Sequence, residues 1–114
     1  MANCIDQIKN APVFVSRCDT YSVDALYSIM KEAFDKLGFT RELVEGKNVL
    51  LKPNLVLAKK PEFGATSHPL FVEACARLIF EMNPASITLA DSPGGPFNSA
   101  NSKVNTDFFN LVAR

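Results

Sequence analysis

Apolar residues along the chain follow two spacings, and the unbroken runs predict strands. The stretch at residues 47–57 contains an aliphatic run that stops at Lys52 and Pro53. A short apolar run with a breaker behind it is typical of a strand buried on both faces of a parallel sheet. Residues 12–16 and 86–90 have a similar composition and are also followed by polar residues. The pattern therefore predicts three strands, one in each of these stretches.

Between the predicted strands, apolar residues recur at intervals of three and four, which predicts two helices with one buried face each. The first helix begins after Ser22, a good N-cap, and ends at Gly38, which suits a left-handed C-terminal position. The second helix has Ser67 or His68 as its cap and Pro69 in its first turn. The residues predicted to be buried are Val23, Leu26, Tyr27, Met30, Phe34 and Leu37 in the first helix and Phe71, Cys75, Leu78, Ile79 and Met82 in the second.

Four other segments have no strong period or are cut short. Residues 1–11 are expected to form a loose lead-in, and residues 39–45 a further helical turn. Residues 53–67 form a loop longer than most in α/β proteins, and such loops often bind ligands. A helix predicted at residues 106–114 stops without a cap, so we expect a truncated helix at the end of a single α/β domain or domain fragment covering residues 1–114.

The order of these elements predicts the fold class and the place of a site. Alternating strands and helices imply an α/β protein, a three-layer βαβαβ unit with a small parallel sheet, and we expect it to be the N-terminal part of a larger α/β domain. Ligands of open parallel sheets bind beyond the carboxyl ends of the strands. Polar residues follow all three predicted strands, at residues 16–19, 52–54 and 91–95. A site is therefore expected at this edge, and a sheet this small is expected to be completed by a second copy or by a missing C-terminal half.

Composition narrows the classes of partner. The chain has 114 residues, with 12 basic and 12 acidic side chains that cancel. This balance favours neither nucleic acid nor an anionic membrane surface, and no apolar run approaches the length of a membrane span. The three cysteines are odd in number and far apart, which argues against a disulfide framework and for a reducing compartment. We therefore expect a cytoplasmic protein.

Four side chains near the predicted sheet edge have each a functional and a structural interpretation. Lys52 could bind a phosphate or carboxylate, or act as a base, and otherwise it extends from a strand end into water. Asn54 binds a ligand or ties its own loop together. His68 is a general acid/base or a metal ligand, and otherwise it caps the helix. Asp91 binds a metal or orients a partner group, and otherwise it caps the turn that follows.

The remaining candidates are ligand-binding backbone and hydroxyl groups. Ser67 lies at a predicted helix start, where free N–H groups and the helix dipole favour an anion. Ser92 offers a hydroxyl, and Gly94 and Gly95 permit close approach of the backbone to a ligand, although a Gly-Gly pair can also serve only as a sharp loop. The chain contains no standard nucleotide loop, Cys-x-x-Cys or His-Glu-x-x-His, so these residues encode no zinc site, iron–sulfur cluster or other cofactor site of a standard motif. Cys18 could lie at the edge of the site.

The segments at residues 49–54, 66–69 and 89–95 together resemble the family called domain of unknown function 362, in order and spacing. The resemblance covers residues 12–112. It implies an association with iron–sulfur redox proteins of bacteria and archaea, because many longer members carry a C-terminal ferredoxin-type module with iron–sulfur clusters. This chain lacks the cluster cysteines. The motif positions carried over, without assigned roles, are Lys52, Asn54, His68, Asp91 and Ser92.

Three functions follow from these residues. The first is a ligand-binding α/β portion of a redox protein that accepts a small anionic molecule, with Lys52, His68 and Asp91 as the candidate catalytic side chains. The second is a metal-dependent hydrolase or transferase that uses Asp91 and His68. The third is a non-catalytic interaction or oligomerisation domain, suggested by Phe108 and Phe109 in the unfinished helix.

Overall fold

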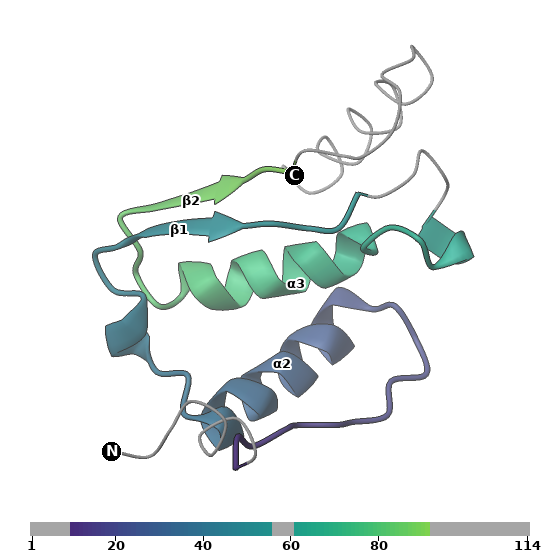
Figure 1. The fold of residues 1–114 in the computed structure, drawn as a ribbon, viewed down its shortest axis with the longest axis horizontal. Coiled ribbons are helices and arrows are strands. Elements are labelled where there is room, and N and C mark those ends of the chain that lie inside the picture. Colours follow the sequence, from purple (N-terminus) through teal and green to yellow (C-terminus); the bar gives the residue numbers. More distant parts are fainter. Residues whose placement is uncertain (1–9, 56–60, 92–114) are drawn as a thin grey trace.

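Two helices and a two-stranded parallel sheet make up the part of the chain that the computed structural model describes, which is residues 10–55 and 61–91 (Figure 1). The elements, in chain order, are α2 (Val23–Leu37), the 3-10 turn η1 (Arg41–Leu43), β1 (Asn48–Leu51), the 3-10 turn η2 (Pro61–Phe63), α3 (Pro69–Phe80) and β2 (Ser86–Leu89). The prediction of a small α/β unit with a parallel sheet is therefore confirmed.

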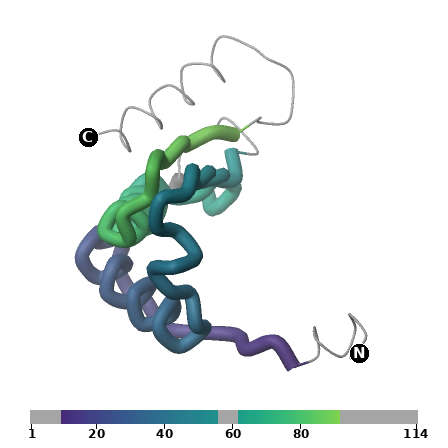
Figure 2. The backbone as a smooth tube through the Cα atoms, turned by 90° about the vertical axis from the view of Figure 1, so that its left-hand side faces the viewer, coloured from purple at the N-terminus to yellow at the C-terminus, as the bar shows by residue number. Residues whose placement is uncertain are grey.

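Strands β1 and β2 pair in parallel, from Asn48 opposite Ser86 to Leu51 opposite Leu89. The connection between them contains α3, as a parallel pair requires. Figures 1 and 2 show α3 lying between the sheet and α2. The described elements thus stack in the order sheet, α3, α2, and both strands point the same way. Their carboxyl ends consequently meet at one edge.

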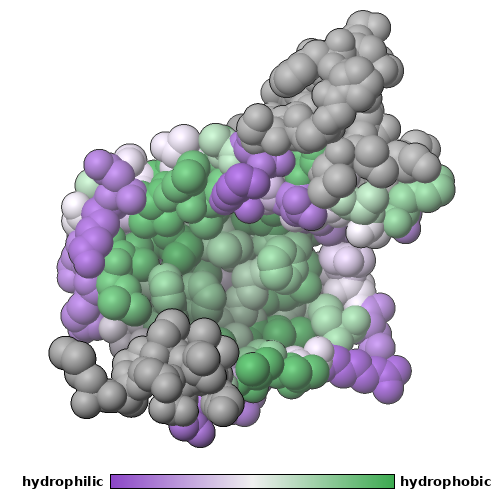
Figure 3. Space-filling view, viewed as in Figure 1, coloured by the Kyte–Doolittle hydropathy of each residue, from purple (hydrophilic) through white to green (hydrophobic). Residues whose placement is uncertain are grey.

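The core lies mainly between the two helices. Leu26 and Met30 of α2 are buried against Ala74 and Leu78 of α3. A second, smaller cluster joins Leu55, Val72 and Leu89 beneath the end of the sheet. On the face of the molecule drawn in Figure 3, apolar residues gather over the middle and hydrophilic residues lie mainly towards the edges. Helix packing therefore supplies most of the described core, and the smaller cluster fixes the end of β1.

The helix boundaries follow their capping residues. Ser22 is the N-cap of α2, and Gly38 ends the helix in the left-handed region at a φ of 71°. The 3-10 turn η1 begins after Thr40, within the predicted turn at residues 39–45. His68 is the N-cap of α3, and Pro69 occupies the first turn, where its missing N–H costs nothing. These cap predictions are confirmed.

The predicted strand at residues 12–16 is wrong. This segment has no regular secondary structure and pairs with neither strand of the described sheet, and Val13 and Val15 are exposed. In Figures 1 and 2 it runs along α2 on the side away from the sheet. Because α2 buries its apolar face against α3, the segment that precedes α2 is held two layers away from a strand edge. Without a neighbouring strand, its apolar composition alone cannot form a ladder.

Burial on both faces of β1 is also wrong. The exposed and half-buried residues alternate along the strand, and the side chain of Leu50 is 61% exposed. The reason is that α3 packs on one face only among the described elements. Phe71, which helical spacing assigned to the core, is 47% exposed, and Leu37 is exposed as well. Neither belongs to the buried cluster between the two helices.

Several predictions fall on residues 1–9, 56–60 and 92–114, which lie outside the described part of the chain. They are most of the lead-in, the middle of the long loop, the ligand candidates Ser92, Gly94 and Gly95, and the truncated helix at residues 106–114. Within the described residues, no helix is long and apolar enough to cross a membrane.

Candidate functional site

Lys52 and Asp91 meet where β1 and β2 end. Lys52 directly follows β1, and Asp91 follows β2 after one intervening residue, Ala90. A hydrogen bond from Ala90 N to Leu51 O (3.1 Å) continues the strand pairing to this point. The Lys52 Nζ and Asp91 Oδ1 atoms lie 2.5 Å apart. The side chain of Asp91 is only 3% exposed, whereas that of Lys52 is 63% exposed. The pair therefore has a buried negative end and a solvent-facing positive end.

The Asp91 carboxylate also holds the chain that follows β1. Its Oδ2 atom accepts a hydrogen bond from the backbone N–H of Leu55 at 3.0 Å. Leu55 is buried, with 2% of its surface exposed. The contact with Lys52 is close but not aligned as a hydrogen bond, so it acts as an ion pair. Asp91 therefore links the end of β2 to Lys52 and to the loop after β1.

Asn54 and Ser67 tie the two ends of the long loop together. Asn54 N donates to Ser67 Oγ at 2.8 Å, and Ser67 N donates to Asn54 O at 2.9 Å. An isolated antiparallel bridge between Leu55 and Thr66 lies next to this pair. The Ser67 hydroxyl and the Asn54 backbone thus have a structural role, while the Asn54 residue as a whole is exposed.

His68 caps helix α3, and its ring stacks on that of Tyr21. The Nδ1 atom accepts a hydrogen bond from Leu70 N at 3.3 Å, and the two ring centroids are 3.8 Å apart at 12°. Partial burial lowers the pKa of the imidazole, and the Glu62 carboxylate opposes this shift. The neutral ring that accepts at Nδ1 carries its proton on Nε2. His68 therefore offers one donor, at Nε2, to anything that reaches it.

The backbone at the start of α3 has few donors left for an anion. Pro69 has no N–H, and Leu70 N is bonded to His68 Nδ1. Phe71 N and Val72 N both donate to His68 O, at 3.0 and 3.2 Å. The expected anion site at this helix start consequently depends on the dipole alone. Lys52 is the better candidate for holding an anion.

A small pocket of about 140 Å³ lies beside Lys52. Its polar lining residues are Lys52 and Ser67, and its apolar ones are Leu51, Pro53, Phe71, Val72 and Cys75. Burial raises the pKa of the Cys75 thiol, which therefore stays protonated and acts as part of an apolar wall. Sequence reasoning assigned Phe71 and Cys75 to the core and missed this wall. The available signal was that Phe71 lies four residues after Ser67, on the first turn of the helix facing the strand end.

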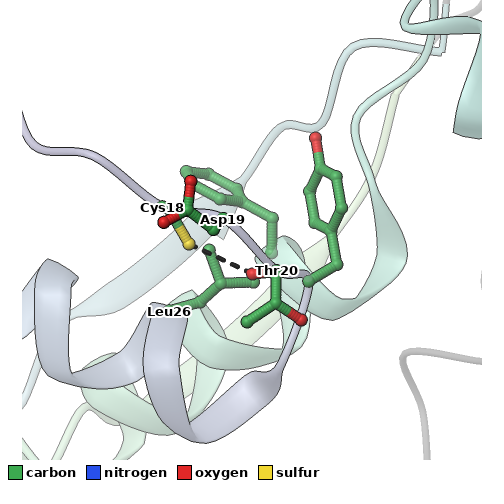
Figure 4. Close-up of a pocket in the computed structure, with 6 residues that line it drawn as sticks. Cys18, Asp19, Thr20 and Leu26 are labelled. Atoms are coloured by element: carbon green, nitrogen blue, oxygen red, sulfur yellow. Dashed lines mark hydrogen bonds between the residues drawn. The ribbon is translucent and has the colours of Figure 1, made fainter.

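A larger cavity of about 520 Å³ lies between the N-terminal segment and the helices (Figure 4). It is lined by Cys18, Asp19, Thr20, Tyr21, Leu26 and Phe71. The thiol of Cys18 donates to Thr20 O at 3.1 Å, as the dashed line in Figure 4 marks. Cys18 and Asp19 therefore border this cavity, and residues 16–19 do not follow a strand as predicted. Phe71 lines both cavities and so lies where they adjoin.

The side chains around this site offer few ligands for a metal ion or an iron–sulfur cluster. Within residues 10–55 and 61–91, no three His, Cys, Asp or Glu side chains are grouped so that they could hold a metal ion. The two carboxylate oxygens of Asp91 face an ammonium and an N–H, and Nδ1 of His68 faces Leu70 N. A cubane iron–sulfur cluster takes four thiolates, and the chain has three cysteines. These residues do not fit a cluster of their own.

Comparison with known protein families shows that this site lies within a recognised family domain. The model of the family named domain of unknown function (DUF362) matches residues 49–111, more than half of the chain. The chain belongs to the DUF362 family. The matched region begins in β1 and contains α3 and β2, so Lys52, Ser67, His68 and Asp91 all lie within it. No curated protein and no solved structure matches the chain.

Proposed function

We propose that this DUF362 domain binds a small anionic molecule at the carboxyl ends of β1 and β2, with Lys52 as the residue that holds the anion. The observation that carries the proposal is the asymmetry of the Lys52–Asp91 pair, in which the carboxylate is buried and the ammonium is exposed. An ammonium has three N–H donors, and one carboxylate oxygen cannot engage them all. Lys52 can therefore contact a second anion while it remains paired.

The opposite charges of Lys52 and Asp91 together predict a modest affinity for an anion. The charge of Asp91 offsets part of that of Lys52, but the carboxylate lies behind the ammonium and also accepts the Leu55 N–H. An approaching anion therefore meets the positive end first. A hydrogen bond to a charged group contributes about 1.5–3 kcal/mol net, which by itself corresponds to a dissociation constant of roughly 6–80 mM. The expected binding is weak and specific to this edge.

The metal-dependent hydrolase or transferase is less well supported. A divalent ion at Asp91 would be repelled by the Lys52 ammonium, which lies against Oδ1, and would have to share Oδ2 with the Leu55 N–H. The second ligand of that hypothesis, His68, uses Nδ1 to cap α3. Anion binding meets neither obstacle. We therefore favour it over a metal centre.

We also propose that the chain is part of a redox protein. The family resemblance supports this proposal, whereas no contact among the described residues bears on it. In this setting the chain is the cytoplasmic ligand-binding portion of an iron–sulfur protein, and the clusters belong to a separate C-terminal part. Reading the source gene beyond codon 114 tests it. A ferredoxin-type Cys-x-x-Cys-x-x-Cys run would support the setting, and a stop codon would contradict it, without affecting the anion site.

Titration of acetate and of inorganic phosphate, followed by backbone amide chemical shifts, tests anion binding directly. Lys52→Gln should abolish the saturable shifts at the strand ends, and its amide can still donate to Asp91. Lys52→Arg keeps the charge and should keep binding. Lys36 provides a matched control, because its side chain is 62% exposed and pairs with Glu32 at 2.6 Å. Lys36→Gln should bind like the wild type.

The proposal is overturned if Lys52→Gln, shown to be folded by its amide spectrum, binds as tightly as the wild type. It is also overturned if Lys36→Gln loses as much affinity, because the anion would then respond only to net charge.

A further inference from the structure

The pocket beside Lys52 restricts the kind of anion that fits. Its walls are mostly apolar, formed by Leu51 at the end of β1 and by Phe71, Val72 and Cys75 on α3. Lys52 is the charged residue in the lining. A fully hydrated ion such as phosphate would leave these walls in contact with water. An anion with an apolar part would cover them.

The volume of the pocket sets the size of that apolar part. At about 140 Å³, it compares with the roughly 150 Å³ of an engineered cavity that binds benzene. Pockets that bury a drug-sized ligand are larger, at about 300–1,000 Å³. The space next to Lys52 therefore suits one six-membered ring or a short aliphatic chain.

Phe71 gives this pocket an aromatic wall. The residue is 47% exposed although its position on α3 matches the buried stripe of the helix. Phe71 lines both the small pocket and the larger cavity. An aromatic side chain at such a border offers a face or edge to a planar ligand at little conformational cost. Phe71 is thus placed to contact the apolar part of a ligand held by Lys52.

We propose that the ligand is a small amphiphilic carboxylate, such as an aromatic or short-chain monocarboxylate. Its carboxylate contacts the Lys52 ammonium, and its apolar body packs against Leu51, Phe71 and Val72. The inference rests on the proposed function, since it assigns a chemical class to the same anion. It goes further by making the apolar walls a second source of affinity.

Three probe molecules separate the two contributions. Benzoate carries the charge and the ring, acetate carries the charge without the ring, and benzyl alcohol carries the ring without the charge. Titrations followed by amide chemical shifts should rank benzoate at least about tenfold tighter than acetate, because the ring removes apolar surface from water. Benzyl alcohol should bind much more weakly than benzoate.

Two phenylalanines on α3 give a matched pair of variants. Phe71→Ala should lower the affinity for benzoate towards that for acetate, with Leu51 and Val72 still in contact with the ring, and leave acetate unchanged. Phe80→Ala removes an exposed ring at the other end of the same helix, outside the pocket, and should leave both affinities unchanged. Because both side chains are exposed, both variants are expected to fold, and their amide spectra would check this.

The outcomes distinguish this inference from the proposed function. If benzoate and acetate bind equally, or if Phe71→Ala behaves like Phe80→Ala, the amphiphilic class is wrong and anion binding stands. If neither acetate nor benzoate binds, both are wrong. If benzyl alcohol binds as tightly as benzoate, the charge has no role and the proposed function is wrong as well.

Discussion

Replacement of Asp91 by alanine should destabilise the protein more than the loss of an ordinary surface ion pair. The carboxylate is almost fully buried and joins the end of β2 to two points after β1, the ammonium of Lys52 and the N–H of Leu55. Alanine removes both contacts. Lys52 is already largely solvent-exposed and loses little, whereas the Leu55 N–H stays in a buried region without its acceptor.

The expected magnitude follows from that difference. A buried backbone donor that loses its partner costs about 1–3 kcal/mol. The ion pair adds up to about 1 kcal/mol, the upper range for exposed pairs, because one partner remains in water. The two contributions together span about 1–4 kcal/mol, and we expect Asp91→Ala to lower the free energy of unfolding by about 2–3 kcal/mol, the middle of that range. Asp91→Asn retains a side-chain oxygen for Leu55 N and should cost about 1 kcal/mol.

Urea denaturation monitored by circular dichroism measures these changes. With a slope of about 2 kcal/mol per molar urea, Asp91→Ala should lower the midpoint by roughly 1 M. Asp19→Ala is the control, because Asp19 is an exposed carboxylate that pairs with Arg17 at 2.7 Å, and its loss should change stability by less than about 0.5 kcal/mol. The reasoning is refuted if Asp91→Ala costs no more than Asp19→Ala. It is also refuted if Asp91→Asn costs as much as Asp91→Ala, because the charge would then outweigh the hydrogen bond.

Three further measurements test the fold around the site. Because burial lowers the folded-state pKa of His68 below its ordinary value of 6.5, its contribution to stability should be complete above pH 6.5 and decrease as the pH falls below it. Urea midpoints of the wild type and of His68→Asn, whose side chain can still cap α3, should therefore differ in slope in this pH window and agree in slope above it. Leu55→Ala should cost about 2–4 kcal/mol in the same assay, whereas Leu50→Ala, at an exposed position of β1, should cost less than about 1 kcal/mol; equal costs would contradict the one-sided sheet. Alkylation at pH 8 followed by peptide mass spectrometry should modify Cys18 much faster than Cys75, because burial raises the pKa of the Cys75 thiol; equal rates would contradict the packing of α3.

Local signals in the sequence were sufficient for the helices and the paired strands. The caps at Gly38 and His68 depend on the chemistry of single residues, and Ser22 occupies the N-cap position of α2 without a capping hydrogen bond from its side chain, so all three boundaries can be recognised from local residue preferences. The spacing of Leu26 and Met30 likewise predicts the face of α2 that packs on α3. These features have local causes, and the prediction succeeded for that reason.

The errors concern contacts between distant parts of the chain. Apolar composition shows that residues 12–16 can form a strand, but a strand also needs an edge to pair with, and the packing of α2 on α3 places the segment away from the sheet. The aliphatic run in β1 suggested burial on both faces. Whether Leu50 is covered depends on which elements lie on each side, and the run itself does not contain that information.

For the site, the sequence predicted where the residues lie but not how they interact. Parallel pairing brings the residues after β1 and β2 to one edge, so the sequence could place Lys52 and Asp91 near each other. It could not show that they form a pair, and the pair changes what each residue can do. The buried carboxylate faces the Lys52 ammonium and the Leu55 N–H, so it can hold the ammonium in a fixed position. A catalytic role for Asp91 stays a prediction, and these contacts add a positioning role to it. Lys52, exposed beside an apolar pocket, remains the group through which this edge of the sheet can bind a ligand.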